Sequence, residues 1–120
     1  MLLTAKIITG IVAFQHFSFL WIEMFAWTTM GKKVFKNFPP DLFEQTKSMA
    51  ANQGLYNGFL AAGLVWTFFI KDIVWASNIG IFFLACVFVA GAYGAISISK
   101  KIFFIQGIPA LLGIILWLAI

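Results

Sequence analysis

The stretch of residues 7–27, IITGIVAFQHFSFLWIEMFAW, decides what kind of protein this chain forms. It is an almost continuous apolar run, and a helix of about 20 such residues crosses the ~30 Å hydrocarbon core of a bilayer. His16 and Glu23 lie within it, seven residues apart. Ionisable side chains inside a membrane-spanning segment are costly and usually mark a functional site or a polar core. The stretch therefore predicts a transmembrane helix that carries a polar site.

The composition of the whole chain agrees with a membrane protein. Of the 120 residues, 62% are hydrophobic and 10% are charged, whereas a soluble domain carries about 25% charged residues. The length allows one domain, residues 1–120. Because the eight basic residues are all Lys and are not gathered on one solvated face, we expect no nucleic-acid partner. The single cysteine, Cys86, excludes an intrachain disulfide and a cysteine zinc cluster.

Four apolar segments follow one another along the chain, and each is near the length that spans a bilayer. They lie at about 6–28, 50–70, 73–97 and 102–120. Lys71-Asp72 and Lys100-Lys101 separate the last three and leave connections of a few residues, so neighbouring helices must run antiparallel. The predicted fold is an all-α integral membrane bundle of four antiparallel transmembrane helices.

The one long connection, residues 28–49, contains Pro39-Pro40, which cannot continue a helix. Asp41 followed three residues later by Glu44 has the spacing of a capping box. We therefore predict that the second helix starts near Leu42. It would contain about 29 residues and measure roughly 43 Å, so its first two turns would extend into the cytosol.

The lysines predict the topology. Cytoplasmic loops carry an excess of positive charge, and six of the eight lysines lie on the side of the first and third connections. These six are Lys32, Lys33, Lys36, Lys47, Lys100 and Lys101, against Lys6 and Lys71 on the other side. The prediction is a multi-pass protein of the cell membrane with a cytoplasmic 28–49 loop and both termini outside. The lysines of this loop, with Phe35 and Phe38, also have the chemistry to contact anionic lipid headgroups.

Tryptophans near helix ends often form an aromatic belt at the membrane interface. The four that the predicted spans place there are Trp27, Trp66, Trp75 and Trp117.

With the helices oriented in this way, polar side chains from all four fall at one depth, in the cytoplasmic half of the bundle. A buried amide or carboxylate in hydrocarbon must find a partner, so we predict a polar pocket or network there. The predicted ligand-contacting residues are Glu23, Asn52, Gln53, Tyr56, Asn57, Tyr93 and Gln106. The alternative is that the amides only join helices, since interhelical hydrogen bonds of about 0.6 kcal/mol are common in membranes.

His16 and Glu23 are the candidate catalytic residues. Thr9, His16 and Glu23 recur every seven residues and form a polar stripe on one face of the first helix. Seven residues correspond to about 10.5 Å along the axis, so His16 can serve Glu23 only as a relay through an intervening group. A structural histidine and a structural, hydrogen-bonded glutamate are the alternatives. His16, Glu23 and Cys86 do not share one depth, so no metal site is expected.

Small residues predict close helix contacts. Gly54, Gly58 and Ala62 form one small-residue ridge, and Ala90 with Gly94 forms a second. Because four short helices enclose little volume, we expect a homo-oligomer that uses these ridges. Pro109, which has no backbone N–H, predicts a kink in the fourth helix.

Several stretches resemble a known family. They are EMFAWT at residues 23–28, KVF at 33–35, AANQGLYNGFLAAGL at 50–64 and QGIPA at 106–110. Together they resemble the small bacterial and fungal membrane proteins catalogued as domain of unknown function 1304. The resemblance implies a four-helix integral membrane protein and supplies no activity and no cofactor.

The leading functional hypothesis is a cytoplasm-facing intramembrane pocket that binds a small amphiphile, a lipid-like molecule or an ion. Glu23 would be the charged or proton-exchanging group, and the amides would orient the ligand. One alternative is a membrane enzyme acting on a lipophilic substrate, with Glu23 as acid or base. The other is a structural or partner-binding membrane subunit. No hydrolase, nucleotide-binding or redox motif is present, so the sequence identifies no cofactor.

Overall fold

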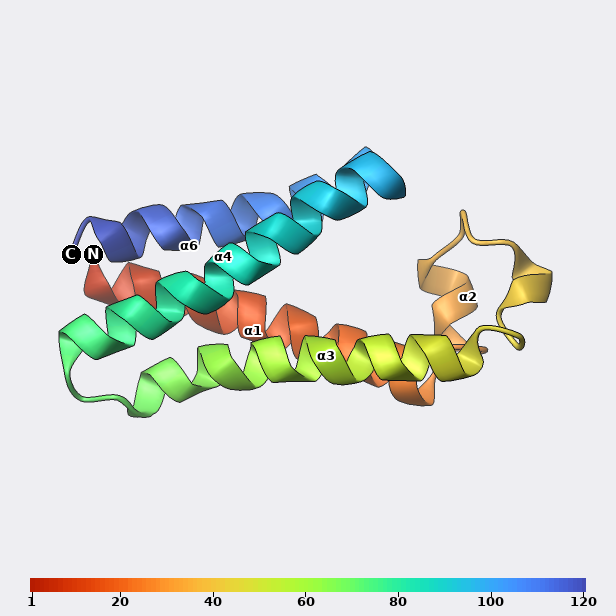
Figure 1. The fold of residues 1–120 in the computed structure, drawn as a ribbon, viewed down its shortest axis with the longest axis horizontal. Helices are drawn as coiled ribbons and strands as arrows, with labels where there is room; N and C mark the ends of the chain where they lie inside the picture. Colours follow the sequence, from red (N-terminus) through yellow and green to blue (C-terminus); the bar gives the residue numbers. More distant parts are fainter. The chain divides into compact units, whose positions relative to one another are not determined.

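The computed structural model describes residues 1–120, which form helices and turns and contain no strand (Figure 1). Three helical stretches are long and apolar enough to cross a membrane, and they are Leu2–Phe25, Ile73–Ser97 and Lys100–Leu118. The elements in order are α1 (Leu2–Phe25), α2 (Met30–Val34), η1 (Pro40–Leu42), α3 (Lys47–Trp66), η2 (Thr67–Phe69), α4 (Ile73–Ser97), α5 (Lys100–Ile102), the π-helix η3 (Phe103–Gly107) and α6 (Ile108–Leu118).

The all-helical prediction is confirmed, and the four apolar segments each correspond to a long helical stretch. The predicted 73–97 segment is α4, residue for residue. Asp72 begins this helix because its side chain accepts hydrogen bonds from the backbone N–H groups of Val74 (2.9 Å) and Trp75 (3.1 Å). α3 is not among the three most apolar stretches, since Asn52, Gln53 and Asn57 lower its hydropathy.

The predicted start of the second helix is wrong. α3 begins at Lys47 instead of Leu42 and has 20 residues, which correspond to about 30 Å. Asp41 makes no capping bond, because Pro40–Leu42 forms a separate turn of 3-10 helix. The predicted extension of two helical turns is therefore absent, and the segment before Lys47 folds back onto Trp27 through Phe43 and Thr46. The sequence prediction also missed the short helix α2.

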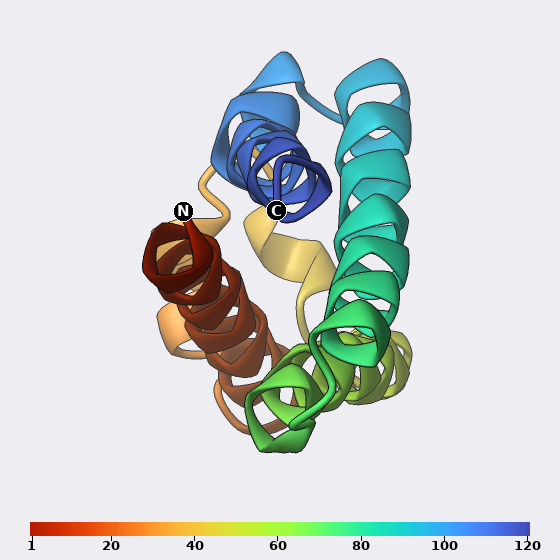
Figure 2. The same cartoon turned by 90° about the vertical axis from the view of Figure 1, so that its left-hand side faces the viewer.

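The chain divides into two compact units, and the first comprises residues Met1–Phe14 and Leu60–Ile120. Within it, α4 and α6 run side by side and in opposite directions (Figure 2). Trp117 is 1% exposed, and its indole Nε1 donates to the hydroxyl of Thr9 at 2.9 Å. The prediction that Trp117 lies in an interfacial belt is therefore wrong, because its N–H has a buried partner. Trp66 and Trp75, in contrast, are exposed.

Pro109 was predicted to kink the fourth helix, and the structure has a π-helix, Phe103–Gly107, shortly before it. The N–H of Ile108 bonds to the carbonyl of Phe103, five residues earlier. This wider turn brings Gly107 against α4, where a Cβ added to Gly91 would lie 2.9 Å from the Gly107 backbone nitrogen. The two glycines therefore allow the backbones of α4 and η3 to touch.

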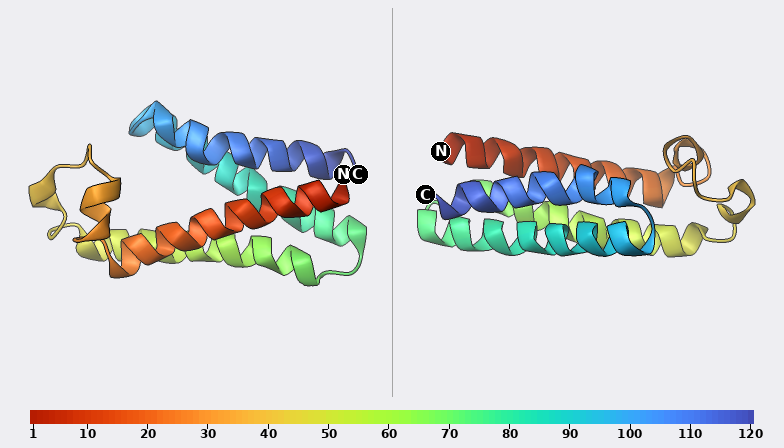
Figure 3. Two further views of the ribbon diagram at one scale, coloured as in Figure 1. Left: turned by 180° about the vertical axis from the view of Figure 1, so that it is seen from behind. Right: turned by 90° about the horizontal axis from the view of Figure 1, so that it is seen from above.

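The second unit comprises residues Gln15–Phe59. It contains the carboxyl-terminal part of α1, the connection that includes α2 and η1, and the amino-terminal part of α3 (Figure 3). Trp27 contacts Phe35, Phe38 and Phe43 with ring-centroid distances of 4.9–5.6 Å. The connection is thus a folded segment built around Trp27.

Gly91→Ala should destabilise the protein by about 1–3 kcal/mol, because its methyl group meets backbone that cannot move aside. The measurement is the free energy of unfolding in mixed micelles by denaturing-detergent titration. Gly10→Ala is the matched control, since its Cβ would lie 3.5 Å from a Phe68 ring carbon, an ordinary contact. Equal losses for the two variants would contradict the close contact between α4 and η3.

Candidate functional site

The polar stripe of α1 faces inward. Thr9, His16 and Glu23 are 0%, 1% and 4% exposed, so the seven-residue spacing identified a buried helix face. Burial in an apolar setting requires that each polar side chain be satisfied by the protein. Glu23 is the group for which this requirement is most demanding, because it is the one carboxylic acid on this face.

Two amides of α3 hold the carboxylate of Glu23. Nε2 of Gln53 donates to Oε2 at 2.7 Å, and Nδ2 of Asn57 donates to Oε1 at 2.6 Å. Gln53 and Asn57 are one helical turn apart, so their side chains reach the same partner from one face of α3. Hydrogen bonds to a carboxylate are shorter and stronger than those between neutral groups. The result is a carboxylate with one amide donor on each oxygen.

Glycine allows α3 to approach α1 closely enough for these bonds. A Cβ added at Gly54 would lie 2.9 Å from Cγ of Met24, 3.0 Å from Cβ of Glu23 and 3.2 Å from the carbonyl oxygen of Leu20. Gly58, one turn later, lies against the side chain of Leu20. The predicted ridge is therefore a contact surface at Gly54 and Gly58. It does not extend to Ala62, which is exposed.

The second predicted ridge needs a similar correction. Gly94 is buried against Ile102, with a hypothetical Cβ 2.8 Å from Cγ2 of that residue, whereas Ala90 is exposed. The face of α4 that packs contains Gly80, Leu84, Val87, Gly91 and Gly94.

Of the predicted site residues, only Gln53 and Asn57 donate hydrogen bonds to Glu23. Asn52 lies on the exposed side of α3, and Tyr56 is 60% exposed with its ring edge-on to Phe59. Tyr93 on α4 is 71% exposed, and Gln106 is half-buried in η3. These last two belong to the first unit, whereas Glu23 belongs to the second.

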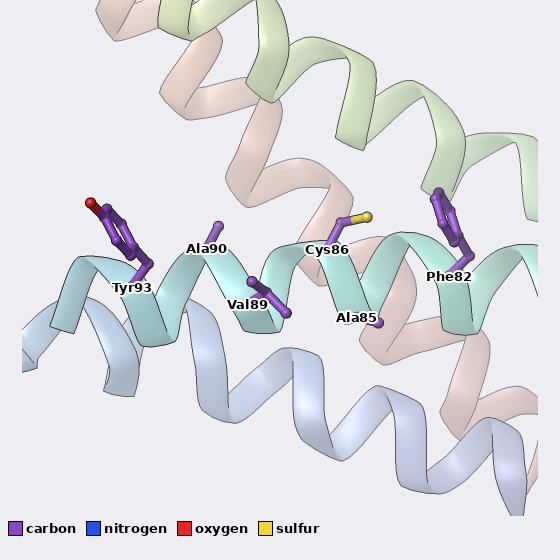
Figure 4. A pocket seen from close by; sticks show the side chains of 6 residues that line it. All are labelled: Phe82, Ala85, Cys86, Val89, Ala90 and Tyr93. Carbon is purple, nitrogen blue, oxygen red and sulfur yellow. The ribbon is translucent and has the colours of Figure 1, made fainter. Parts of the chain in front are cut away.

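A shallow hollow lies elsewhere, along α4 (Figure 4). The side chains that line it are Phe82, Ala85, Cys86, Val89, Ala90 and Tyr93. All six come from one helix and most are apolar, so the hollow has no constellation of polar groups to orient a ligand. It contains none of the amides predicted for the polar pocket.

His16 has an aromatic environment. Its ring lies edge-on to Phe19 with a centroid distance of 5.3 Å, and it is two helical turns from Glu23 on α1. No group of three or more His, Cys, Asp or Glu side chains is arranged to hold a metal ion. The chemistry that the cluster itself offers is hydrogen bonding and negative charge, from Glu23, Gln53 and Asn57.

Two polar contacts were missed by the sequence analysis. Trp117 donates to Thr9, and Nε1 of Trp27 donates to Oγ1 of Thr46 at 3.0 Å. The sequence could have indicated only that a tryptophan N–H that becomes buried needs an acceptor. Nothing in the residue spacing identified which hydroxyl would supply it.

The fold and the cluster define a class, a small all-helical protein whose most apolar helices are long enough to cross a membrane and whose buried carboxylate is held by amides. The chain belongs to the family described as protein of unknown function (DUF1304), whose model matches residues 10–118. The resemblance noted from the sequence motifs is thereby confirmed.

A relative in Lactococcus lactis subsp. lactis (strain IL1403), described as uncharacterized protein YpaA, is similar along most of its length. It is 27% identical over 111 residues, which cover 91% of this chain and 92% of YpaA. No solved structure matches the chain.

Asn57→Ala should lower the free energy of unfolding by about 0.6–1.7 kcal/mol, between the average and the largest value for interhelical hydrogen bonds in a membrane protein. The reason is that Oε1 of Glu23 loses its donor while remaining buried. Asn37→Ala is the matched control, and the expected change is within about 0.5 kcal/mol because Asn37 is exposed in the 28–49 connection. Denaturing-detergent titration measures both. Indistinguishable values would mean that the bond to Asn57 adds nothing to stability.

Proposed function

We propose that this protein is a multi-pass protein of the cell membrane with four antiparallel spans. In this proposal α3 crosses the membrane in addition to the three most apolar helical stretches. Three stretches have the length and apolarity to span, and α3 has 20 residues, near the required length. The lysine distribution supports a cytoplasmic 28–49 connection and termini on the opposite side. In this arrangement Glu23 lies near the cytoplasmic end of the first span.

Within this arrangement, we propose that Glu23 binds the cationic head of a small amphiphile, or a cation. The observation that carries the proposal is that both hydrogen-bond partners of the buried carboxylate are neutral amides. Its charge is solvated by donors but is not balanced by a basic side chain, and a charge in a low-dielectric setting attracts an opposite charge strongly. An ammonium group would supply that opposite charge.

Access to the carboxylate lies on the side of the amides. Gln53 is exposed and Asn57 is half-buried, so a ligand head reaches the cluster past them. Each amide also carries a carbonyl oxygen, which accepts the remaining N–H groups of an ammonium ion. Asn52 and Tyr56, exposed on α3, offer further polar contacts.

A second candidate function is supported by the close packing around Gly54. In it, the hydrogen-bonded carboxylate serves only to fix the register of α1 and α3, and the protein is a structural or partner-binding membrane subunit. The enzyme hypothesis has less support. Its proton relay would begin at His16, which lies about 10.5 Å along the helix from Glu23.

We also propose that the protein forms a homo-oligomer. Asn52 is exposed on a helix that we place in the membrane, where an amide without a partner costs free energy. Amides both donate and accept, so a second copy of the same helix supplies complementary groups.

Dodecylamine is a suitable probe of the binding hypothesis, because it carries one ammonium head on an apolar tail. We expect Glu23→Gln to weaken its binding to the purified protein in maltoside micelles at least tenfold, about 1.4 kcal/mol. Isothermal titration calorimetry measures the affinity, with dodecyl alcohol as the uncharged comparison.

Glu44→Gln is the matched control, since Glu44 is an exposed glutamate of the 28–49 connection. It should change the affinity less than twofold. Equal binding by Glu23→Gln and the parent protein would refute the binding proposal. Loss of thermal stability in Glu23→Gln with unchanged dodecylamine affinity would favour the structural candidate.

A further inference from the structure

The segment of residues 27–47, which joins α1 to α3, has properties that the Glu23 site does not use. We call it the basic loop. It contains Lys32, Lys33, Lys36 and Lys47 against Asp41 and Glu44, so four positive and two negative charges leave a formal net charge of +2. All four lysines are exposed.

The basic loop is folded. The indole N–H of Trp27 bonds to the hydroxyl of Thr46 at 3.0 Å and so ties the beginning of the loop to its end. Phe43 is 1% exposed and packs 4.9 Å from both Trp27 and Phe38, measured between ring centroids. Gly31 is buried against Trp27 and Phe43, because an added Cβ would lie 3.2 Å from Trp27 and 3.4 Å from Phe43. The lysines are therefore mounted on a defined aromatic base.

The short helix α2 places apolar and basic side chains together on the outside of this base. Met30 and Val34 are 39% and 48% exposed and, four residues apart, share one side of the helix. Lys33 is adjacent to Val34, and Lys36 follows two residues after the end of α2. Exposed apolar side chains bordered by lysines are typical of helices that lie in the headgroup region of a bilayer.

The chain path brings this surface to the end of a candidate membrane span. α1 ends at Phe25, two residues before the loop begins, and α3 starts at Lys47. The loop lies beyond the end of α1 and before the start of α3 (Figure 3). With α1 in the membrane, as proposed above, the loop would lie at the bilayer surface. Its positive charge then complements the phosphodiester groups of anionic phospholipids.

We propose that the basic loop is a binding site for the headgroup of an anionic phospholipid. The ammonium groups of Lys32, Lys33 and Lys36 contact the phosphate, and Met30 with Val34 contact the first carbons of the acyl chains. The aromatic base keeps the lysines in position. This site is separate from Glu23 and requires only that α1 spans the membrane.

The test is lipid selectivity of the purified full chain in maltoside micelles, where no bilayer surface exists and a lipid must be held by the protein. Native mass spectrometry during titration compares phosphatidylglycerol with phosphatidylcholine of the same acyl chains. We expect the parent protein to prefer phosphatidylglycerol at least tenfold. Lys32→Gln with Lys33→Gln should reduce this preference by about tenfold or more, since each lysine near a lipid surface contributes roughly a fivefold factor.

Lys100→Gln with Lys101→Gln is the matched control, because these two lysines are also adjacent and exposed. It removes the same charge and should change the preference less than twofold. Thr46→Val retains every lysine but removes the acceptor of Trp27, and it should also lower the preference. Unaltered helical content by circular dichroism shows that each variant folds.

Three results would overturn the proposal. One is an equal loss in both lysine double variants, which would mean that net charge alone attracts the lipid. Another is an unchanged preference in the Lys32 and Lys33 double variant. The third is displacement of phosphatidylglycerol by inorganic phosphate at matched ionic strength, which would identify a free phosphate ligand. Glu23→Gln should retain the preference, so failure of the Glu23 proposal is distinguishable from failure of this one.

Discussion

The structure depends on the need to solvate one carboxylate inside an apolar helix. Glu23 is 4% exposed, and burial of an unsolvated charge is among the most costly events in a protein interior. Its donors, Gln53 and Asn57, come from α3, so α1 and α3 must approach closely and in one register. Gly54 makes that approach sterically feasible, because any side chain there would collide with α1. The polar contact and the glycine contact therefore depend on each other.

The first unit follows the same physical rule with different residues. The indole of Trp117 donates to Thr9, and the hydroxyl of Thr9 donates to the carbonyl of Ala5 at 2.7 Å. Gly80 lies against this indole, because a Cβ added at Gly80 would be 3.0 Å from the indole nitrogen. In apolar surroundings, association of helices relies on close packing and on hydrogen bonds between polar side chains. In each unit a glycine lies next to the hydrogen-bonded side chains: Gly54 next to Glu23, and Gly80 next to Trp117. The small residue allows the helices to come close enough for these side chains to form their hydrogen bonds.

Much of this could be predicted from the sequence, because apolar length and polar periodicity act locally. The runs interrupted at Lys71-Asp72 and Lys100-Lys101 gave the helices, and the seven-residue stripe through Glu23 identified the buried face of α1. The start of α3 was wrong because the packing of Phe43 on Trp27 depends on tertiary contacts that no capping pattern encodes. For Tyr56, which is 60% exposed, the predicted depth did not indicate on which side of the helix the side chain lies, since depth does not fix the rotation of a helix. The same limit applies to Trp117, whose position near a helix end resembles that of a belt residue.

The most direct test of the Glu23 cluster is a distance measurement by solid-state NMR in lipid bilayers. Glu44→Gln leaves Glu23 as the sole glutamate, so a ¹³Cδ-glutamate label reports on it alone, and ¹⁵N-labelled asparagine side chains provide the partner. The account predicts strong dipolar dephasing from an amide nitrogen about 3.5 Å from the carboxyl carbon, and loss of that dephasing in Asn57→Ala. Absence of dephasing in the protein with Asn57 intact would show that the carboxylate is not held by this amide and would contradict the account.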